Sequence, residues 1–272
     1  MTTHTIFNEN CFDTIARFKA DGTKVNVILT SPPYNTARYV KTERAMEILN
    51  NRYDIHFDNM SDEDYHNWTR DLFTEFEKVL APNGVILYNI SYGSENPNAM
   101  WEAVEAIRET DFMIADTIIW KKSSALPNNT SSNKLTRIVE FVFVVCRKSE
   151  FGTFQANKGL KSISEKTGQK YYENVFNFIE APNNDGPCKL NKATYSSQLV
   201  LDLLNIYARE NDIIYDPFMG TGTTVIGCHR YADGHNNLVC YGSELSAAQI
   251  EFSENRIREY IDAHPVEATL FK

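Results

Sequence analysis

Hydrophobic and polar positions alternate along the chain in two blocks, and each block predicts strands followed by helices. In the first block, residues 25–29 form a short β-branched run that stops at two prolines, which predicts a buried strand. Ser61 and Asp62 then open a segment whose large apolar residues recur at steps of three and four: Tyr65, Trp68, Leu72, Phe76 and Val79. This spacing predicts a helix with one apolar face that ends before Asn83-Gly84.

The other predicted elements follow the same alternation. In the first block we expect strands at 85–90, 114–120 and 138–146 and a helix at 99–108. In the second block we expect helices near 196–207, up to Tyr231 and at 247–260, with strands at 212–215 and 237–241. Such alternation predicts an α/β fold with a doubly wound, mostly parallel sheet and helices on both faces.

The region between the blocks is irregular. Residues 152–192 hold no hydrophobic period for more than a few positions, and such a stretch in a compact protein has a binding role or is mobile. We therefore divide the chain at 1–120, 121–192 and 193–272, with the last sheet strand of the middle part near 138–146.

Charge is distributed unevenly along the chain. The protein has a net charge of −9, yet residues 121–192 hold twelve basic and six acidic residues, which gives +6 there and −15 elsewhere. A basic segment in an acidic chain suits a surface that contacts phosphates. Charge alone is equally compatible with a solvated loop region enriched in lysine by chance.

Composition excludes several other classes of protein. The N-terminus lacks a basic start followed by an apolar run, and no stretch has the apolar length of a membrane span. The five cysteines are scattered and form no C-x-x-C pair, which argues against a disulfide framework and against a metal site. We expect a soluble, cytoplasmic protein that does not contact a membrane.

A glycine-rich turn after the strand at 212–215 is the candidate cofactor pocket; it carries Asp216, Pro217, Phe218, Gly220, Gly222 and Thr223. Ligands bind at the carboxyl ends of strands in such sheets, and glycines let the backbone approach them. Glu244, 22 residues after Gly222, is placed to accept hydrogen bonds from ribose hydroxyls. Val225 stands where a dinucleotide pattern has its third glycine, so the turn favours a nucleoside over a pyrophosphate. A strand–turn–helix connection without a ligand is the alternative.

The first predicted strand ends in Ser31, Pro32, Pro33 and Tyr34. Two prolines fix φ and have no N–H group, so they present a rigid backbone with carbonyl acceptors. Ser31 adds a hydroxyl acceptor, and Tyr34 adds a ring on which a flipped base can stack. An exocyclic base amine is a poor nucleophile because its lone pair is delocalised, and acceptors that hold its hydrogens localise that pair. A rigid turn without a catalytic role is the alternative for this loop taken alone.

Together, Ser-Pro-Pro-Tyr and the downstream Asp-Pro-Phe-x-Gly-x-Gly-Thr-Thr closely resemble the permuted β-type DNA amino-methyltransferases of restriction–modification systems. The resemblance covers nearly the whole chain and extends to Ile119-Trp120-Lys121. It implies a circularly permuted, Rossmann-like methyltransferase fold with a target-recognition insertion in the basic middle region. It also implies S-adenosyl-L-methionine as cofactor and double-stranded DNA as substrate. A companion restriction endonuclease is a further implied partner, and the chain is expected to be a monomer or a homodimer.

By this resemblance Ser31, Pro32, Pro33 and Tyr34 are the catalytic residues that hold the target base. The implied cofactor-binding residues are Asn10, Asp216, Pro217, Phe218, Gly220, Gly222, Thr223 and Glu244, and no metal is implied. Asn10 departs from the family, in which many members have Asp before the nearby cysteine. Asn191–Ser196 departs from a His-Pro-Ala-x-Phe-Pro pattern, although Tyr195 keeps the aromatic residue. Residues 35–58 are interpreted as a lid over the site or as a surface excursion.

The competing functions are each disfavoured by a feature of the sequence. Pro187-Cys188 is like the nucleophile of cytosine-C5 methyltransferases, but it lies away from a cofactor motif, so we interpret Cys188 as structural. RNA or small-molecule methylation fits the chain order and the basic region less well. A non-catalytic cofactor-binding module would need a damaged Ser31–Tyr34 loop. Ser31 favours cytosine N4 as the target, with adenine N6 as the alternative, because adenine-specific relatives mostly carry Asp or Asn there.

Overall fold

The computed structural model describes residues 2–35, 59–93, 96–125, 127–129, 131–186, 188, 190–191, 194–234 and 237–265. Its centre is an eight-stranded sheet with the order β1-β10-β9-β2-β3-β5-β4-β8. The strands are β1 (Thr3–Phe7), β2 (Val25–Thr30), β3 (Leu80–Ile90), β4 (Phe112–Lys122), β5 (Val139–Arg147), β8 (Phe178–Ala181), β9 (Ile213–Asp216) and β10 (Val239–Ser243). Neighbouring strands pair in parallel except where β5 opposes β3 and β4, which confirms the mostly parallel sheet.

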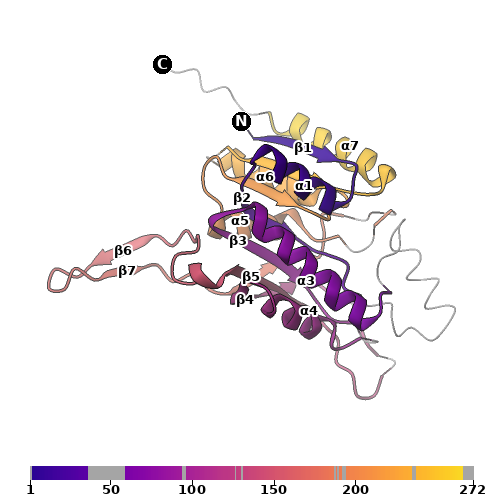
Figure 1. Cartoon of the computed structure of the whole chain (residues 1–272), viewed down its shortest axis with the longest axis horizontal. Helices are drawn as coiled ribbons and strands as arrows, with labels where there is room; N and C mark the ends of the chain where they lie inside the picture. The colour runs from indigo at the N-terminus through magenta and orange to yellow at the C-terminus, as the bar shows by residue number, and fades with distance from the viewer. Residues whose placement is uncertain are drawn as a thin grey trace.

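Helices cover both faces of this sheet (Figure 1). Apolar side chains of α1 (Cys11–Asp21), α3 (Asp62–Val79) and α4 (Ala99–Arg108) form one buried cluster with the strands. The opposite cluster joins the sheet to α5 (Ser197–Tyr207), α6 (Thr223–Gly234) and α7 (Ala247–Ala263). Two separate apolar layers on one sheet make the doubly wound arrangement that the sequence predicts. Among the described helices, none is long and apolar enough to cross a membrane.

The helix predicted after Ser61 forms as α3, and its cap and buried face explain why the hydrophobic pattern predicts it correctly. The Ser61 side chain accepts a hydrogen bond from the Asp64 backbone N–H at 3.0 Å and caps the helix. Three acidic residues occupy the first turn, where they favour the helix dipole, and Tyr65, Leu72 and Phe76 are buried as expected. The helices at 99–108 and 196–207 and the strands of the second block are likewise confirmed within a few residues.

Three elements of the main sheet and its cover are not predicted from the sequence. β1 and α1 form at the N-terminus, and β8 pairs with β4 at the outer edge of the sheet. The Trp120 indole N–H donates to the Ala181 carbonyl at 3.2 Å and fastens this added strand. The strand expected at 138–146 is therefore an inner strand of the sheet, with β8 outside it.

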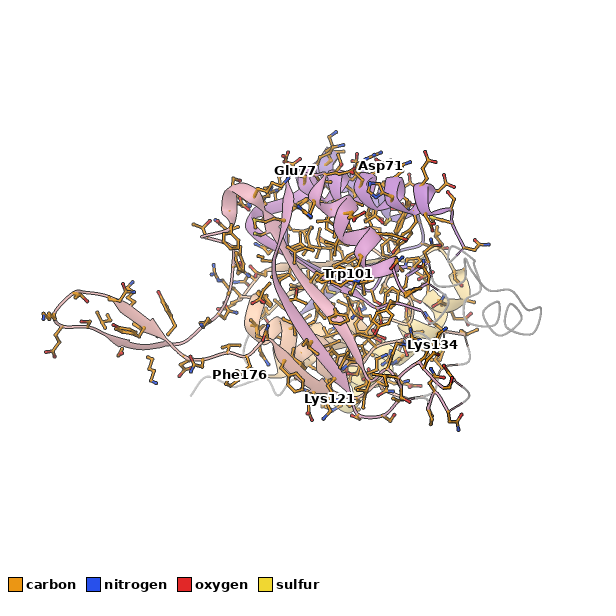
Figure 2. The ribbon with its side chains drawn as sticks, turned by 90° about the horizontal axis from the view of Figure 1, so that it is seen from below. Asp71, Glu77, Trp101, Lys121, Lys134 and Phe176 are labelled. Atoms are coloured by element: carbon orange, nitrogen blue, oxygen red, sulfur yellow. The ribbon has the colours of Figure 1, made fainter. Side chains whose placement is uncertain are left out.

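A two-stranded hairpin leaves the body of the molecule between β5 and β8 (Figures 1 and 2). We call residues 158–176 the arm; it contains β6 (Leu160–Ile163) and β7 (Lys170–Tyr172), which pair antiparallel. Every residue of β6 and β7 is exposed. The arm has no apolar core of its own, so its shape depends on the two strands and their turn alone.

Candidate active site

Both sequence motifs lie at one edge of the sheet, although about 185 residues separate them. β2 pairs in parallel with β9, with Ile28 opposite Tyr215. Ser31 therefore follows one strand and Pro217 the strand beside it. Between these strands the order of the sheet reverses, which is where open α/β sheets bind ligands. The Thr30 hydroxyl donates to the Asp216 carboxylate at 3.0 Å and ties the two strand ends together.

Asp216 is fully buried beneath the glycine-rich turn. One carboxylate oxygen accepts from Thr30 and from the Phe218 backbone N–H, at 3.0 Å each. The other accepts from the Tyr195 hydroxyl at 2.9 Å and from the Thr224 hydroxyl. Burial raises the pKa of Asp216, and these hydrogen bonds oppose that rise. Since four protein donors occupy the carboxylate, Asp216 shapes the site from within, and Tyr195 belongs to the same network.

The turn itself is built by glycine conformation and by packing on α7. Gly220 and Gly222 have φ values of +54° and +79°, in the left-handed region that side chains disfavour. A Cβ on Gly222 would lie 3.0 Å from the Ser253 Cβ, so a glycine at this position lets α7 pack closely on the turn. Pro217 and Thr223 are buried, and the Thr223 hydroxyl accepts from the Arg256 guanidinium at 3.0 Å.

Glu244 stands at the end of β10 beside this turn. Its carboxylate oxygens accept from the Gly220 N–H at 2.9 Å and from the Ser246 N–H at 2.8 Å. Burial raises the pKa of Glu244, and the backbone hydrogen bonds oppose that rise. Each carboxylate oxygen keeps a further lone pair, so the oriented and partly exposed carboxylate can still accept from ligand hydroxyls.

Aromatic residues of α3 connect the two motifs. The Tyr65 hydroxyl donates to the Pro33 carbonyl at 2.9 Å, which holds the second proline of the loop. The Tyr65 ring stacks on Trp68, with centroids 5.8 Å apart, and Trp68 lies 5.6 Å from Phe218 of the turn. The helical pattern predicts Tyr65 and Trp68 as core residues, and their contact with the site becomes visible only in the fold.

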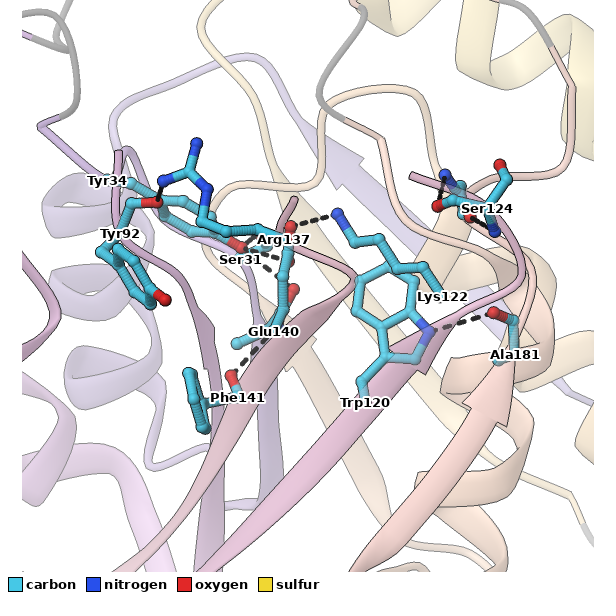
Figure 3. Close-up of polar contacts among 12 residues, drawn as sticks. Ser31, Tyr34, Tyr92, Trp120, Lys122, Ser124, Arg137, Glu140, Phe141 and Ala181 are labelled. Carbon is cyan, nitrogen blue, oxygen red and sulfur yellow. Dashed lines mark hydrogen bonds and ion pairs between the residues drawn. The ribbon is translucent and has the colours of Figure 1, made fainter. Parts of the chain in front are cut away.

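The Ser31–Tyr34 loop has its hydroxyls anchored by the sheet (Figure 3). The Tyr34 hydroxyl lies 2.8 Å from Ser31 Oγ and donates towards Asn89 Oδ1 at 3.0 Å and Glu140 Oε2 at 3.2 Å. Pro32 is buried, while Ser31 and Tyr34 are partly exposed. Asn89 and Glu140 are not among the site residues predicted from the sequence. The available signal was a polar residue inside each of two largely apolar strands, since buried polar groups need partners.

Some of the predicted site residues lie at the margin of this edge. Asn10 is exposed and caps α1, accepting from the Phe12 N–H at 3.0 Å. Nearby, Asn8 donates to the Glu244 carbonyl at 3.0 Å, so the segment after β1 borders the turn. Cys188 is partly exposed with a free thiol. The predicted lid at 35–58 lies outside the described residues except for Asn35. Within the described ranges, no three His, Cys, Asp or Glu side chains gather as a metal site requires.

A doubly wound sheet with these two motifs at its switch point defines the Rossmann-like methyltransferase fold. The chain belongs to the DNA methylase family N6_N4_Mtase, which it matches over residues 25–255.

Relatives and solved structures agree with this assignment. The chain is 25% identical to the orphan methyltransferase M.BamHII of Bacillus amyloliquefaciens, over 88% of this chain and 91% of that protein. It is similar in fold to the PvuII cytosine-N4-specific DNA methyltransferase, with a TM-score of 0.63, 16% identity, and coverage of 96% of this chain and 93% of the other. It is also similar to the structure of the M1.HpyAVI–SAM complex, with a TM-score of 0.57, 19% identity, and coverage of 93% and 98%.

Proposed function

We propose that this protein transfers a methyl group from S-adenosyl-L-methionine to an exocyclic amine of a base in a specific sequence of double-stranded DNA. The observation that carries the proposal is the placement of the Ser31–Tyr34 loop and the glycine-rich turn on the adjacent strand ends of β2 and β9. Family membership and a fold shared with a protein crystallised with this cofactor support it.

The residues of the turn fit this cofactor. Glu244 offers an oriented carboxylate for ribose hydroxyls, and Gly220 brings the backbone close to it. Phe218 and Trp68 supply aromatic surface beside the turn. Asp216, Gly222 and Thr223 hold the shape of the turn through buried contacts, and Asn10 and Pro217 complete the proposed pocket. When bound, S-adenosyl-L-methionine supplies an electrophilic methyl group on a sulfonium centre.

The residues of the loop act on the base. Ser31 accepts a hydrogen of the amine and helps to localise its lone pair, while Pro32 and Pro33 keep the backbone rigid. The Tyr34 ring, fixed through its hydroxyl, supports the base once it has been flipped out of the duplex. Rate enhancement comes mainly from positioning the amine in line with the methyl group, which needs no covalent enzyme intermediate.

We propose that the arm is an outlying contact to DNA; it leaves the sheet at the amino edge, opposite the Ser31–Tyr34 loop. It carries Lys158, Lys161, Lys166 and Lys170 against Glu165 and Glu173, together with exposed aromatic residues such as Phe176. A two-stranded ribbon is narrow enough to enter the major groove, and lysines can neutralise the flanking phosphates. The target recognition expected in 121–192 is therefore shared with the described parts of the segments between β4 and β5 and after β8, which lie at the carboxyl edge beside the loop.

We favour cytosine N4 as the acceptor. Ser31 in the catalytic loop and the fold shared with a cytosine-N4-specific enzyme support this choice. Adenine N6 is the second candidate because both amines are conjugated to the ring in the same way. We further propose a permuted chain order, a cytoplasmic location, and a monomer or homodimer that works with or without a companion endonuclease.

Radiolabelled methyl transfer tests the proposed function. Purified protein and tritiated S-adenosyl-L-methionine are incubated separately with duplex DNA of mixed sequence and with RNA, and acid-precipitable label is counted. We expect label in DNA from the wild type and a strong reduction with Tyr34→Ala. Label in RNA alone, or none in any nucleic acid from protein that binds the cofactor, would reject the proposal. Methylation-sensitive sequencing of DNA from expressing cells then gives the recognition sequence.

A further inference from the structure

Glu140 is a charged residue in a largely apolar strand, and its side chain points at the catalytic loop (Figure 3). The side chain is only 15% exposed and forms an ion pair with Lys122 of β4. The Lys122 ammonium also lies 4.9 Å from the Trp120 ring centroid, which helps to hold it in place. The other carboxylate oxygen of Glu140 faces the Tyr34 hydroxyl at 3.2 Å. A carboxylate that accepts from an ammonium on one side can only accept on the other.

Asn89 presents a second acceptor to the same hydroxyl, and its orientation is fixed. Its amide nitrogen donates to the Phe141 carbonyl at 3.1 Å. An amide in the opposite orientation would set two carbonyl oxygens against each other, so Oδ1 is the atom that faces Tyr34 at 3.0 Å. The single hydrogen of the Tyr34 hydroxyl is therefore directed at Asn89 and Glu140.

The direction of the Tyr34 hydroxyl determines which residue donates in the hydrogen bond between Tyr34 and Ser31. The two hydroxyl oxygens lie 2.8 Å apart, and geometry alone allows either to donate. Because the Tyr34 hydrogen is committed to Asn89 and Glu140, Ser31 donates to Tyr34. Both lone pairs of Ser31 Oγ are then left to accept. An exocyclic amine has hydrogens to give, whereas an unprotonated ring nitrogen would need a donor.

We infer that Glu140, with Asn89, is a positioning residue that sets the hydroxyl direction in the Ser31–Tyr34 pair and so makes Ser31 an acceptor for an amine. The inference rests on the proposed function for its chemical meaning. The contact between Glu140 and the Tyr34 hydroxyl can be tested without catalysis. Glu140 acts through Tyr34, so its effect on catalysis depends on that hydroxyl.

A double-mutant cycle measures this dependence. Single-turnover methyl transfer is measured for the wild type, Tyr34→Phe, Glu140→Gln and the double variant. Tyr34→Phe keeps the ring and removes the hydroxyl. We expect each single variant to slow transfer by about tenfold to a hundredfold with cofactor and DNA affinities unchanged. The double variant should be no slower than Tyr34→Phe alone, because the shared hydroxyl is already absent. Multiplied effects, or a wild-type rate in Glu140→Gln, would overturn the inference.

Glu180→Gln is the matched control. Glu180 forms an ion pair with Lys121, at 2.6 Å, on the neighbouring strands β8 and β4. The substitution therefore removes a similar charge pair without touching the loop, and its transfer rate should equal that of the wild type. A slowing equal to that of Glu140→Gln would mean that loss of a nearby charge, and not the Tyr34 contact, causes the effect.

A spectroscopic readout keeps the inference independent of activity. The Cζ carbon of Tyr34 is followed by NMR in protein labelled with ¹³C-tyrosine, and its signal is assigned by its loss in Tyr34→Phe. We expect the signal to shift in Glu140→Gln and to stay in place in Glu180→Gln. An unmoved signal in both variants would refute the Glu140 contact even in an active enzyme. A shift in a protein that methylates no DNA would reject the proposed function and leave the contact standing.

Discussion

The carboxyl edge of the sheet and the arm differ in how their side chains are held. At the edge, the buried Asp216 carboxylate accepts from four protein donors, and the Tyr34 hydroxyl is bonded to β3 and β5. In the arm every residue of both strands is exposed, and Phe176 shows 77% of its surface. A reaction centre needs positions fixed to a fraction of an ångström, whereas a surface that follows a nucleic acid can adapt to it. Substitutions at the edge should therefore change stability, catalysis or cofactor affinity, whereas substitutions in the arm should change DNA affinity.

Asp216→Ala should have the largest effect of these substitutions, because it should lower the stability of the folded protein. It removes the acceptor of three hydroxyls and one backbone N–H that are buried in the site. We expect a loss of about 3 kcal/mol or more in the free energy of unfolding, since each unpaired buried donor costs about 1–3 kcal/mol. Urea unfolding measures it, with Asp71→Asn on the exposed face of α3 as control. If Asp216→Ala lowers the free energy of unfolding no more than Asp71→Asn does, the hydrogen bonds of Asp216 do not stabilise this edge of the sheet.

Tyr34→Ala should spare the fold and remove most of the catalysis. Both the ring and the anchored hydroxyl are removed, so we expect methyl transfer to fall by about a hundredfold or more, typical of a removed positioning group. Cofactor affinity should stay nearly constant because the loop lies on the neighbouring strand end. Single-turnover kinetics and calorimetry measure the two quantities. Equal turnover in the variant would be incompatible with the role of Tyr34.

Glu244→Ala should lower the affinity for S-adenosyl-L-methionine by about tenfold to a hundredfold. Hydrogen bonds to a charged acceptor contribute about 1.5–3 kcal/mol to binding. The fold should survive, since Glu244 is partly exposed. Calorimetry on the folded variant measures the affinity. If affinity is unchanged, Glu244 does not belong to the pocket.

The affinity for the cofactor should also depend on pH through Glu244. Burial raises the pKa of Glu244, so protonation begins at a higher pH than for an ordinary glutamate. Protonation removes the charged acceptor, and cofactor affinity should therefore be full above the raised pKa and fall as the pH drops through it. Affinity measured from pH 8 to pH 5 should decline in the wild type and stay flat in Glu244→Gln. Parallel curves for the two proteins would assign the titration to another group.

Changes in the arm should have the smallest effects on the fold and the most selective ones on DNA. Lys161→Gln with Lys170→Gln should leave the melting temperature unchanged, because both side chains are exposed. DNA affinity should fall a few-fold, and the slope of log K against log salt should decrease by about 0.9 for each phosphate that the arm no longer neutralises. Lys19→Gln on α1 is the control. An unchanged salt slope would remove the arm from the DNA interface.

The edge and the arm also differ in how much of their structure can be predicted from the sequence. Periodicity predicts α3 and α4 closely, because their apolar faces are buried against the sheet and leave a regular pattern. Pattern does not predict β8, a four-residue edge strand whose partner lies about sixty residues away, nor the exposed arm. The motifs supply Ser31–Tyr34 and Glu244. Asn89 and Glu140 join the site only because β3 and β5 pair beside β2, which is a property of the tertiary fold.

The modified base itself shows whether the site methylates an exocyclic amine. DNA modified by the purified protein is digested to nucleosides, and the methylated nucleoside is identified by mass spectrometry against standards. We expect N4-methylcytidine in its deoxy form and none from Tyr34→Ala. N6-methyladenine would change the choice of base but keep the amine chemistry. A product methylated on a ring carbon, such as 5-methylcytosine, would show that the site does not methylate an exocyclic amine.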